Sequence, residues 1–448
     1  MYYKKMLWLL CATVLASQPS YAKEASAQKD HSKLPASMVP RDAKQAPPVE
    51  KVTLNQVISI GLRQSPQIKA FAAGVAMAEG ENKQAGVLIN PELGVEIENV
   101  AGGGPYKGAD GAEVTFGASQ TIELGGKVSA RKAIAGKGLE IANLEHQAIA
   151  LDLVRDITIA YASFIEAEEN VRIATEQKEL AKDVLKSVSK RVDAAAAPLI
   201  QKNRAEVERS IASVALDKAT REHVTARKNF SVLLGVESFE TALDTEPFFA
   251  LKLPITTQAE EILDANPDLL KLNSTLAQAG ARLTLEQANA IPDPRINVGI
   301  RDFRDTGDQA FILGVSVPLP VMNSNQGNIE KARSDFARAE HINKQKVLDI
   351  KALLTSQQQA LENAYVEAET IRTEMLPAAE KAFKLAREGY ELGRFPYLEV
   401  LDAQRSLFAV KQQYIFALKE YHVSLANVER LAAVHLPKLK NIGEFYAQ

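Results

Sequence analysis

The sequence predicts an α+β membrane protein that contains two copies of one structural unit. Three observations support this prediction: an internal duplication, two pairs of alternating strands, and unusually long helices. The 448 residues would allow two or three ordinary domains. A duplication with a period of about 200 residues is too long for a solenoid, so it indicates one internally repeated fold.

The first 22 residues have the pattern of a secretory signal peptide. Lys4 and Lys5 form a basic start, residues 6–16 are apolar, and the stretch ends in Ser-Tyr-Ala. This apolar run is too short to span a bilayer, so we expect a cleaved signal peptide at 1–22 and an exported protein.

Composition excludes several functional classes. Cys11 lies in the signal and is the only cysteine, so the mature chain has no disulfide, thiolate metal site or cysteine nucleophile. Removing the two signal lysines changes the net charge from −3 to about −5, with basic residues scattered along the chain, which argues against nucleic-acid binding. No later stretch approaches 18 consecutive apolar residues, so any part that spans a membrane must consist of strands.

The duplication can be followed residue by residue. Pro66 aligns with Pro267, and Pro198 of "APLIQKN" aligns with Pro396 of "FPYLEVL". The resulting division of the mature chain is an extended N-terminal segment 23–50, a first repeat 51–235, a linker or equatorial segment 236–258, a second repeat 259–435 and a C-terminal tail 436–448.

Each repeat has the same predicted order: a short helix, a medium helix, a β-hairpin, a very long helix, a turn and a further helix. The predicted ranges are 53–64, 66–89, hairpin 92–122, 127–192 and 199–234, then 259–265, 268–290, hairpin 295–319, 325–388 and 397–434. A helix of about 65 residues extends roughly 100 Å. Seven-residue spacing of Val400, Leu407 and Tyr414 predicts coiled-coil packing.

The strands are predicted from strict alternation. Leu93, Val95 and Ile97 alternate with small or charged residues, and the same pattern recurs between Ile296 and Leu319. Strands of roughly 8–10 residues are long enough to cross a bilayer when tilted. Because lipid does not tolerate open sheet edges, four strands would have to join strands of other copies, eight in total for two copies and twelve for three. Strand pattern alone also fits a half-buried hairpin on a soluble domain.

Two local features have alternative interpretations. Gly389, Gly393 and Pro396 permit a tight turn between two long helices. This turn is either a bend alone or also a surface that a partner binds. Glu399 and Asp402, which follow the turn, belong either to a solvated helix face or to a charged ring.

The sequence contains no recognisable catalytic, phosphate-binding or metal-binding motif. The glycine-rich stretch 101–111 lacks the Gly-Lys-Ser/Thr ending of a phosphate-binding loop and is expected to be a hairpin loop. None of the six histidines lies within four residues of another, as a paired helical metal site requires. We therefore expect no enzyme activity, no cofactor and no metal site in this chain.

Duplicated halves, each with a hairpin and long coiled helices behind a signal peptide, resemble the TolC-like outer membrane factors. The resemblance covers about 52–435 and is carried locally by 288–300, 314–336 and 397–433. Within that family, the chain is most similar to the outer membrane components of cobalt–zinc–cadmium cation efflux systems. One departure is Lys23, which stands where many relatives have an acylated cysteine.

The resemblance implies a homotrimer in the outer membrane with a large periplasmic part. Four strands per protomer would form a 12-stranded barrel, continuous with a long periplasmic α-helical barrel. Its inner end would dock on a periplasmic adaptor protein and an inner-membrane pump of the resistance-nodulation-division class. The chain would then be the exit duct for divalent heavy-metal cations. The alternatives are the same duct for multidrug efflux or type I secretion, and a soluble periplasmic coiled-coil scaffold.

The resemblance also assigns expected sites at the inner end of the tunnel. The expected adaptor-docking residues are Leu392, Gly393, Arg394, Phe395, Tyr397, Pro198 and Leu199. Glu399 and Asp402 are expected to narrow the tunnel entrance as a ring of acidic residues.

Overall fold

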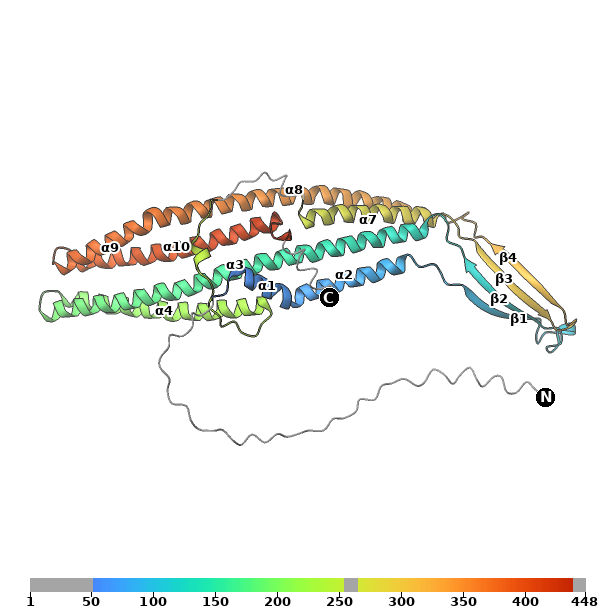
Figure 1. Cartoon of the computed structure of the whole chain (residues 1–448), viewed down its shortest axis with the longest axis horizontal. Coiled ribbons are helices and arrows are strands. Elements are labelled where there is room, and N and C mark those ends of the chain that lie inside the picture. The colour runs from blue at the N-terminus through green and yellow to red at the C-terminus, as the bar shows by residue number, and fades with distance from the viewer. Residues whose placement is uncertain (1–50, 254–264, 438–448) are drawn as a thin grey trace, which may run out of the picture. The chain divides into compact units, whose positions relative to one another are not determined.

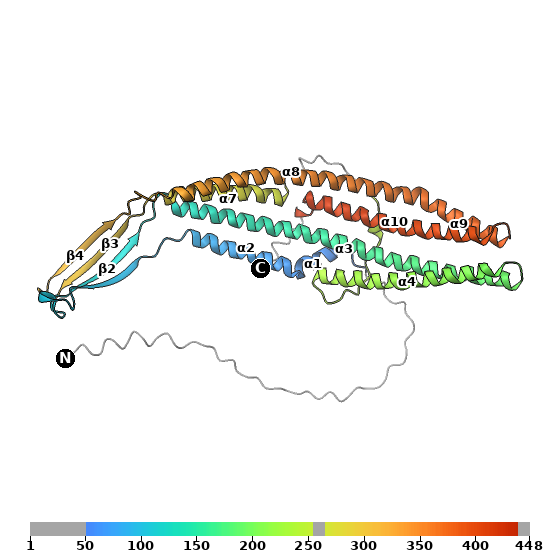
Figure 2. The ribbon, with the colours of Figure 1, turned by 180° about the vertical axis from the view of Figure 1, so that it is seen from behind.

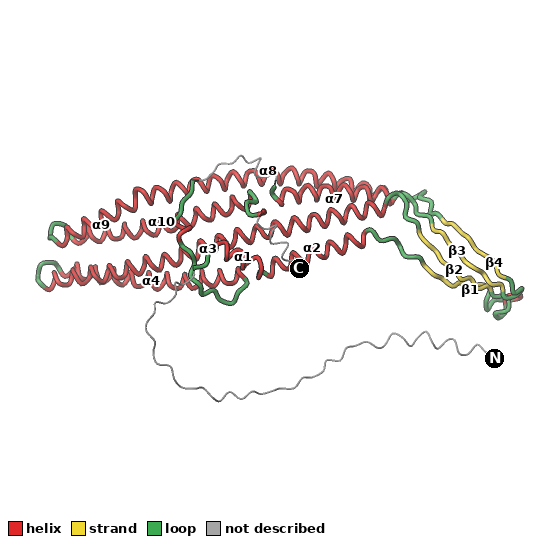
Figure 3. Tube along the Cα trace, in the orientation of Figure 1, coloured by secondary structure: helices red, strands yellow, loops and turns green. Residues whose placement is uncertain are grey.

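The computed structural model describes residues 51–253 and 265–437. The predicted signal peptide 1–22, the segment 23–50, nearly all of the short helix 259–265 and most of the tail 436–448 lie outside these residues. Within the described part, long helices run side by side and a four-stranded sheet continues from one end of them (Figures 1 and 2). The opposite end carries only helix hairpins and their turns, as the secondary-structure colouring in Figure 3 shows.

The described elements follow the same order in both halves of the chain. In the first half they are α1 (Leu54–Gln64), α2 (Pro66–Ala85), β1 (Glu92–Glu98), the 3₁₀ turn η1 (Gly104–Tyr106), β2 (Glu113–Thr121), α3 (Lys127–Asp193) and α4 (Leu199–Leu234). The short α5 (Glu246–Phe249) follows, and the second half contains α7 (Pro267–Asn289), β3 (Arg295–Phe303), β4 (Gln309–Ser316), α8 (Gln326–Thr370), η2 (Ile371–Met375), α9 (Leu376–Glu391) and α10 (Tyr397–Leu431).

The two hairpins form one antiparallel sheet in the order β1-β2-β3-β4, and β2 pairs with β3 across the repeat boundary. Residues in register share a face, so Val95, Phe116, Ile300 and Phe311 form one apolar row across the sheet. These side chains are exposed, up to 90% for Phe311. The sheet therefore presents an apolar face that nothing within the described chain covers.

The opposite face of the sheet is polar and bears ion pairs across the strands. Arg301 on β3 reaches Glu98 on β1 and Glu113 on β2, both at 2.7 Å, and its Nε donates to the Thr115 hydroxyl at 2.9 Å. Strand alternation thus separates an apolar from a charged surface, as predicted. The predicted fourth strand is too long, because β4 ends at Ser316; Pro318 has no backbone N–H to extend the ladder.

The junction between sheet and helices is closed by a buried lysine. Lys127 Nζ lies 2.7 Å from the Asp293 carboxylate and donates to the Ile291 carbonyl at 2.7 Å. The same carboxylate accepts from the Leu124 backbone N–H at 2.8 Å. Gly125 and Gly126 adopt φ of 70° and 77°, which lets the chain turn sharply into α3. The chain therefore passes from β2 into α3 through the short connection at residues 122–126.

The two long helices differ, contrary to the prediction of one continuous helix over 325–388. α3 is uninterrupted for 67 residues, whereas its counterpart contains a π turn, η2, between α8 and α9. Pro377 has no N–H, so the carbonyl of Thr373 loses its regular helical donor. The Leu376 N–H bonds instead to the Ile371 carbonyl, five residues back. None of the described helices has an apolar stretch long enough to cross a bilayer.

The main core lies where α1, α4 and α5 pack against α3 and α10. It contains Phe230, Phe248, Ile157 and Leu418 in fully buried positions. His422 on α10 stacks on the Phe248 ring and its Nε2 lies 2.9 Å from the Phe248 carbonyl. Burial lowers the pKa of His422, which favours the neutral form of this packed imidazole.

Candidate functional site

Two helix hairpins meet at the end of the bundle farthest from the sheet (Figure 1). α3 and α4 are joined by residues 194–198, and α9 and α10 by residues 392–396. The repeat alignment pairs Ala195 with Gly393 and Pro198 with Pro396. Each chain thus provides two related turns at one end.

The second turn is closed by backbone hydrogen bonds around a left-handed glycine. Gly393 has φ of 73°, and the Arg394 N–H donates to the Gly389 carbonyl at 2.7 Å. A Cβ on Gly389 would overlap the Phe395 ring. Any side chain at residue 389 would therefore displace Phe395, which packs directly on the Gly389 backbone.

The first turn closes in the same way without a glycine. Ala195 takes φ of 55°, and the Ala196 N–H donates to the Arg191 carbonyl at 2.8 Å. An L-residue pays roughly 1–2 kcal/mol for the left-handed conformation. The two turns therefore share a geometry that only the second one adopts without strain.

The two hairpins are held together by residues near the turns. Arg191 of α3 donates to the Tyr390 carbonyl at 2.5 Å, and its guanidinium lies 4.7 Å from the centre of the Tyr390 ring. The Tyr390 hydroxyl donates to the Gln201 side chain of α4 at 3.2 Å. A further ion pair joins Glu208 of α4 to Arg405 of α10. The turns are thus positioned as one unit.

Most residues expected to dock a partner are exposed at this end. Leu392 and Leu199 are more than 60% exposed, and Pro198, Gly393, Arg394 and Phe395 are also exposed. Tyr397 is not: its side chain is only 2% exposed, packs near Tyr390, and has its pKa raised to about 12 by burial. The expectation for Tyr397 is therefore wrong, because α10 turns this position toward its neighbours.

The sequence reasoning missed two exposed residues. Ile200 and Leu398 occupy equivalent positions in the repeats and are exposed to nearly the same extent, 54% and 55%. The aligned segments "APLI" and "FPYL" contain this signal, since both follow a proline by two residues. The structure thus marks one matched aliphatic side chain beside each turn.

The two acidic candidates lie on α10 next to the turn. Glu399 and Asp402 are exposed and three residues apart, which places them on one helix face. Asp402 is close enough to Arg405 for their charges to interact. Across residues 51–253 and 265–437, no group of three or more His, Cys, Asp or Glu side chains is arranged to hold a metal ion.

A family model for outer membrane efflux proteins matches residues 57–236 and 259–434. The chain belongs to the outer membrane efflux protein family. The two matched segments correspond to the two halves of the fold. The protein is accordingly placed in the outer membrane with a large periplasmic part. Family members form trimers and work with an adaptor and an inner-membrane pump in tripartite systems.

Individual relatives agree with this assignment. The cobalt-zinc-cadmium resistance protein CzcC of Cupriavidus metallidurans is 28% identical over 414 residues, covering 91% of this chain and 95% of the relative. The nickel-cobalt-cadmium resistance protein NccC of Alcaligenes xylosoxydans is 25% identical and covers 66% of each chain. A crystal structure of the channel protein CusC superimposes with a TM-score of 0.72 at 18% identity, covering 88% of this chain and 96% of CusC. The resemblance to TolC-like channels is thereby confirmed.

Exchanging glycine and alanine between the two turns tests their shared geometry. Gly393→Ala is expected to destabilise the protein by roughly 1 kcal/mol, because alanine disfavours positive φ. Ala195→Gly is expected to stabilise it by roughly 0.5 kcal/mol, since relief of strain exceeds the added chain entropy. Thermal unfolding of the detergent-solubilised protein, followed by circular dichroism, measures both. Shifts of the same sign would contradict the shared left-handed geometry.

Proposed function

We propose that this efflux protein is the outer membrane exit channel of a tripartite resistance-nodulation-division pump that exports divalent heavy-metal cations. The observation that carries the substrate class is the similarity to a cobalt-zinc-cadmium resistance protein across 91% of the chain. The chain itself acts as a passive duct, and metal choice resides in the pump.

In the proposed assembly three copies surround one channel. Their sheets form a 12-stranded barrel with the exposed apolar face toward lipid and the charged face toward the lumen. The outer edges of β1 and β4, which have no partner strand among the described residues, support this arrangement, because strands in lipid need partners on both sides. The helices continue the barrel as a periplasmic tunnel with six turns at its inner end.

The turns are proposed to dock the periplasmic adaptor. The docking edge consists of Leu392, Gly393, Arg394, Phe395, Pro198 and Leu199, with Ile200 and Leu398 added from their matched exposure. In three copies, Ile200 and Leu398 together provide six exposed aliphatic side chains at related positions, which are suited to apolar contact with helix tips of the adaptor. Glu399 and Asp402 are proposed to form a ring that favours cations at the tunnel entrance.

Loss of the channel is expected to sensitise cells to divalent metals. A deletion strain should lose growth on zinc, cadmium or cobalt at concentrations that the parent tolerates, and the intact gene should restore it. Growth on a panel of organic antibiotics should be unchanged. Sensitivity to the antibiotics but not to the metals would assign the channel to organic substrates and overturn the metal proposal.

Charged substitutions at the matched aliphatic positions test docking. Ile200→Asp with Leu398→Asp should lower site-specific cross-linking to the adaptor at least fivefold, because a carboxylate opposes apolar contact. Val232→Asp, at a somewhat more exposed site at the other end of α4, should leave cross-linking unchanged. Arg394→Glu extends the test to the turn itself. Normal cross-linking and metal resistance in all variants, at normal channel levels, would make the turns structural only.

Bilayer conductance tests the acidic ring. Asp402→Asn and Glu399→Gln should each shift the reversal potential in a salt gradient toward zero, since fewer carboxylates attract cations. Glu246→Gln on α5 removes the same charge far from the turns and should leave the reversal potential unchanged. Unaltered cation selectivity in both ring variants would exclude these residues from the entrance.

A further inference from the structure

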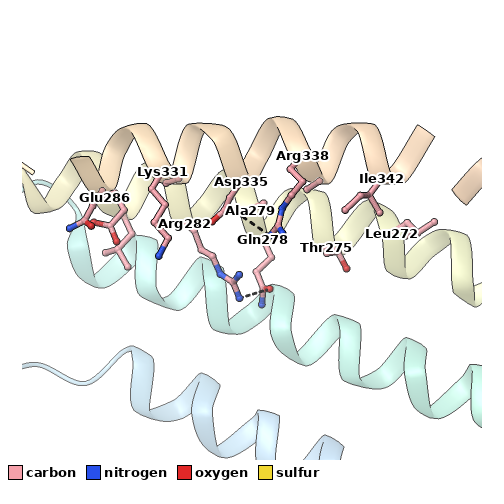
Figure 4. A pocket seen from close by; sticks show the side chains of 14 residues that line it. Leu272, Thr275, Gln278, Ala279, Arg282, Glu286, Lys331, Asp335, Arg338 and Ile342 are labelled. Carbon is pink, nitrogen blue, oxygen red and sulfur yellow. Dashed lines mark hydrogen bonds and ion pairs between the residues drawn. The ribbon is translucent and has the colours of Figure 1, made fainter. Parts of the chain in front are cut away.

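A groove between α7 and α8 is not explained by the channel function. It has a volume of about 410 Å³ and is lined by fourteen residues of the two helices (Figure 4). Volumes of this order are typical of small-molecule sites. The groove lies in the part of the helix pair that leads into β3 and β4.

Interhelical hydrogen bonds join the two helices near both ends of the groove. Near the sheet, the Asn325 side chain donates to the backbone carbonyl and the carboxylate of Glu286, at 2.8 and 2.7 Å. At the other end, Asn343 donates to the Asn273 side chain at 3.2 Å. Residues 273 and 286 are thirteen positions apart, which corresponds to roughly 20 Å along a helix. The groove is therefore elongated along the two helices.

The lining combines an apolar surface with an excess of positive charge. Aliphatic side chains come from both helices: Leu272, Ala279, Leu285, Ala332, Ala339 and Ile342. Three cationic and two acidic side chains complete the charged part of the lining: Arg282, Lys331, Arg338, Glu286 and Asp335. The charge balance thus favours an anion, and the aliphatic part favours an apolar chain.

The partners of these charges show which cations remain available. Asp335 pairs with Arg338 at 3.2 Å, and Glu286 is engaged by Asn325. Among the residues that the structure describes, the partner of Arg282 is neutral, the Gln278 side chain at 3.0 Å. Lys331 has no carboxylate within ion-pair distance among the described residues. Figure 4 shows the Arg282 guanidinium and the Lys331 ammonium on the same side of the helix pair.

We propose that this groove binds a phosphate group carried on an alkyl chain, with Arg282 and Lys331 on the phosphate and the aliphatic lining on the chain. A guanidinium and an ammonium together match the charge and the acceptor oxygens of a phosphate. Each methylene buried along the groove strengthens binding further. Such a ligand comes either from membrane phospholipid, given the proposed placement of the adjoining sheet in lipid, or from a soluble alkyl phosphate.

Binding to the purified full-length protein in a neutral detergent tests the proposal. Dodecyl phosphate should bind at least a hundredfold more tightly than inorganic phosphate, because only the former fills the apolar lining. Arg282→Gln with Lys331→Gln should weaken dodecyl phosphate binding at least tenfold. Arg333→Gln removes a charge on α8 outside the groove and should have no effect. Ala339→Phe should weaken binding by filling the groove without changing charge.

A second arm separates the two sources of the ligand. In nanodiscs of neutral lipid doped with phosphatidylglycerol, wild-type protein should enrich the anionic lipid and the double variant should not if membrane lipid is the ligand. Binding of dodecyl phosphate without lipid enrichment supports the soluble source. Equal binding by wild type and both groove variants would overturn the inference. Channel conductance of the same preparations distinguishes this result from a failure of the proposed function. If the channel proposal is wrong, the wild-type protein will not conduct, whatever the groove binds.

Discussion

The outer edges of β1 and β4 impose the constraint on which the rest of the molecule depends. Neither edge has a partner strand within the described residues, and both border an exposed apolar face. An unpaired backbone group costs several kcal/mol in an apolar medium. β1 and β4 run antiparallel to each other, and both place their apolar side chains on the same face of the sheet. The β4 edge of one copy can therefore pair with the β1 edge of the next without any change in fold. The proposed ring of three copies satisfies this constraint.

The order of the helices follows from the order of the strands. α2 leads into β1, β2 into α3, α7 into β3, and β4 into α8, so each strand continues into one helix. The helices pack in the matching sequence, α2 against α3, α3 against α7, and α7 against α8. The buried Lys127–Asp293 pair fixes the junction where the backbone changes from strand to helix. A sheet that closes therefore imposes the same closure on the helices.

The two halves share this plan but have diverged where local chemistry permits. The turn geometry is conserved between them, although one copy uses glycine and the other alanine at positive φ. Pro377 introduces a π turn in one long helix and has no counterpart in the other. Arg191 of the first half contacts Tyr390 of the second, so each turn depends on residues of the other repeat. The two turns at the inner end have thus diverged in sequence, and residues of the two halves now contact each other there.

The sequence by itself determined the features that arise from near neighbours in the chain. Period-two alternation predicts strands, heptad spacing predicts the α10 seam, and glycine with proline predicts the turns, because each depends on only a few consecutive residues. Tertiary structure alone decided the burial of Tyr397, the pairing of β2 with β3, and the groove between α7 and α8. Each of these depends on side chains far apart in sequence, as Arg191 and Tyr390 are, 199 residues apart. Packing of distant segments sets which face of a helix is covered, and no local pattern encodes that choice.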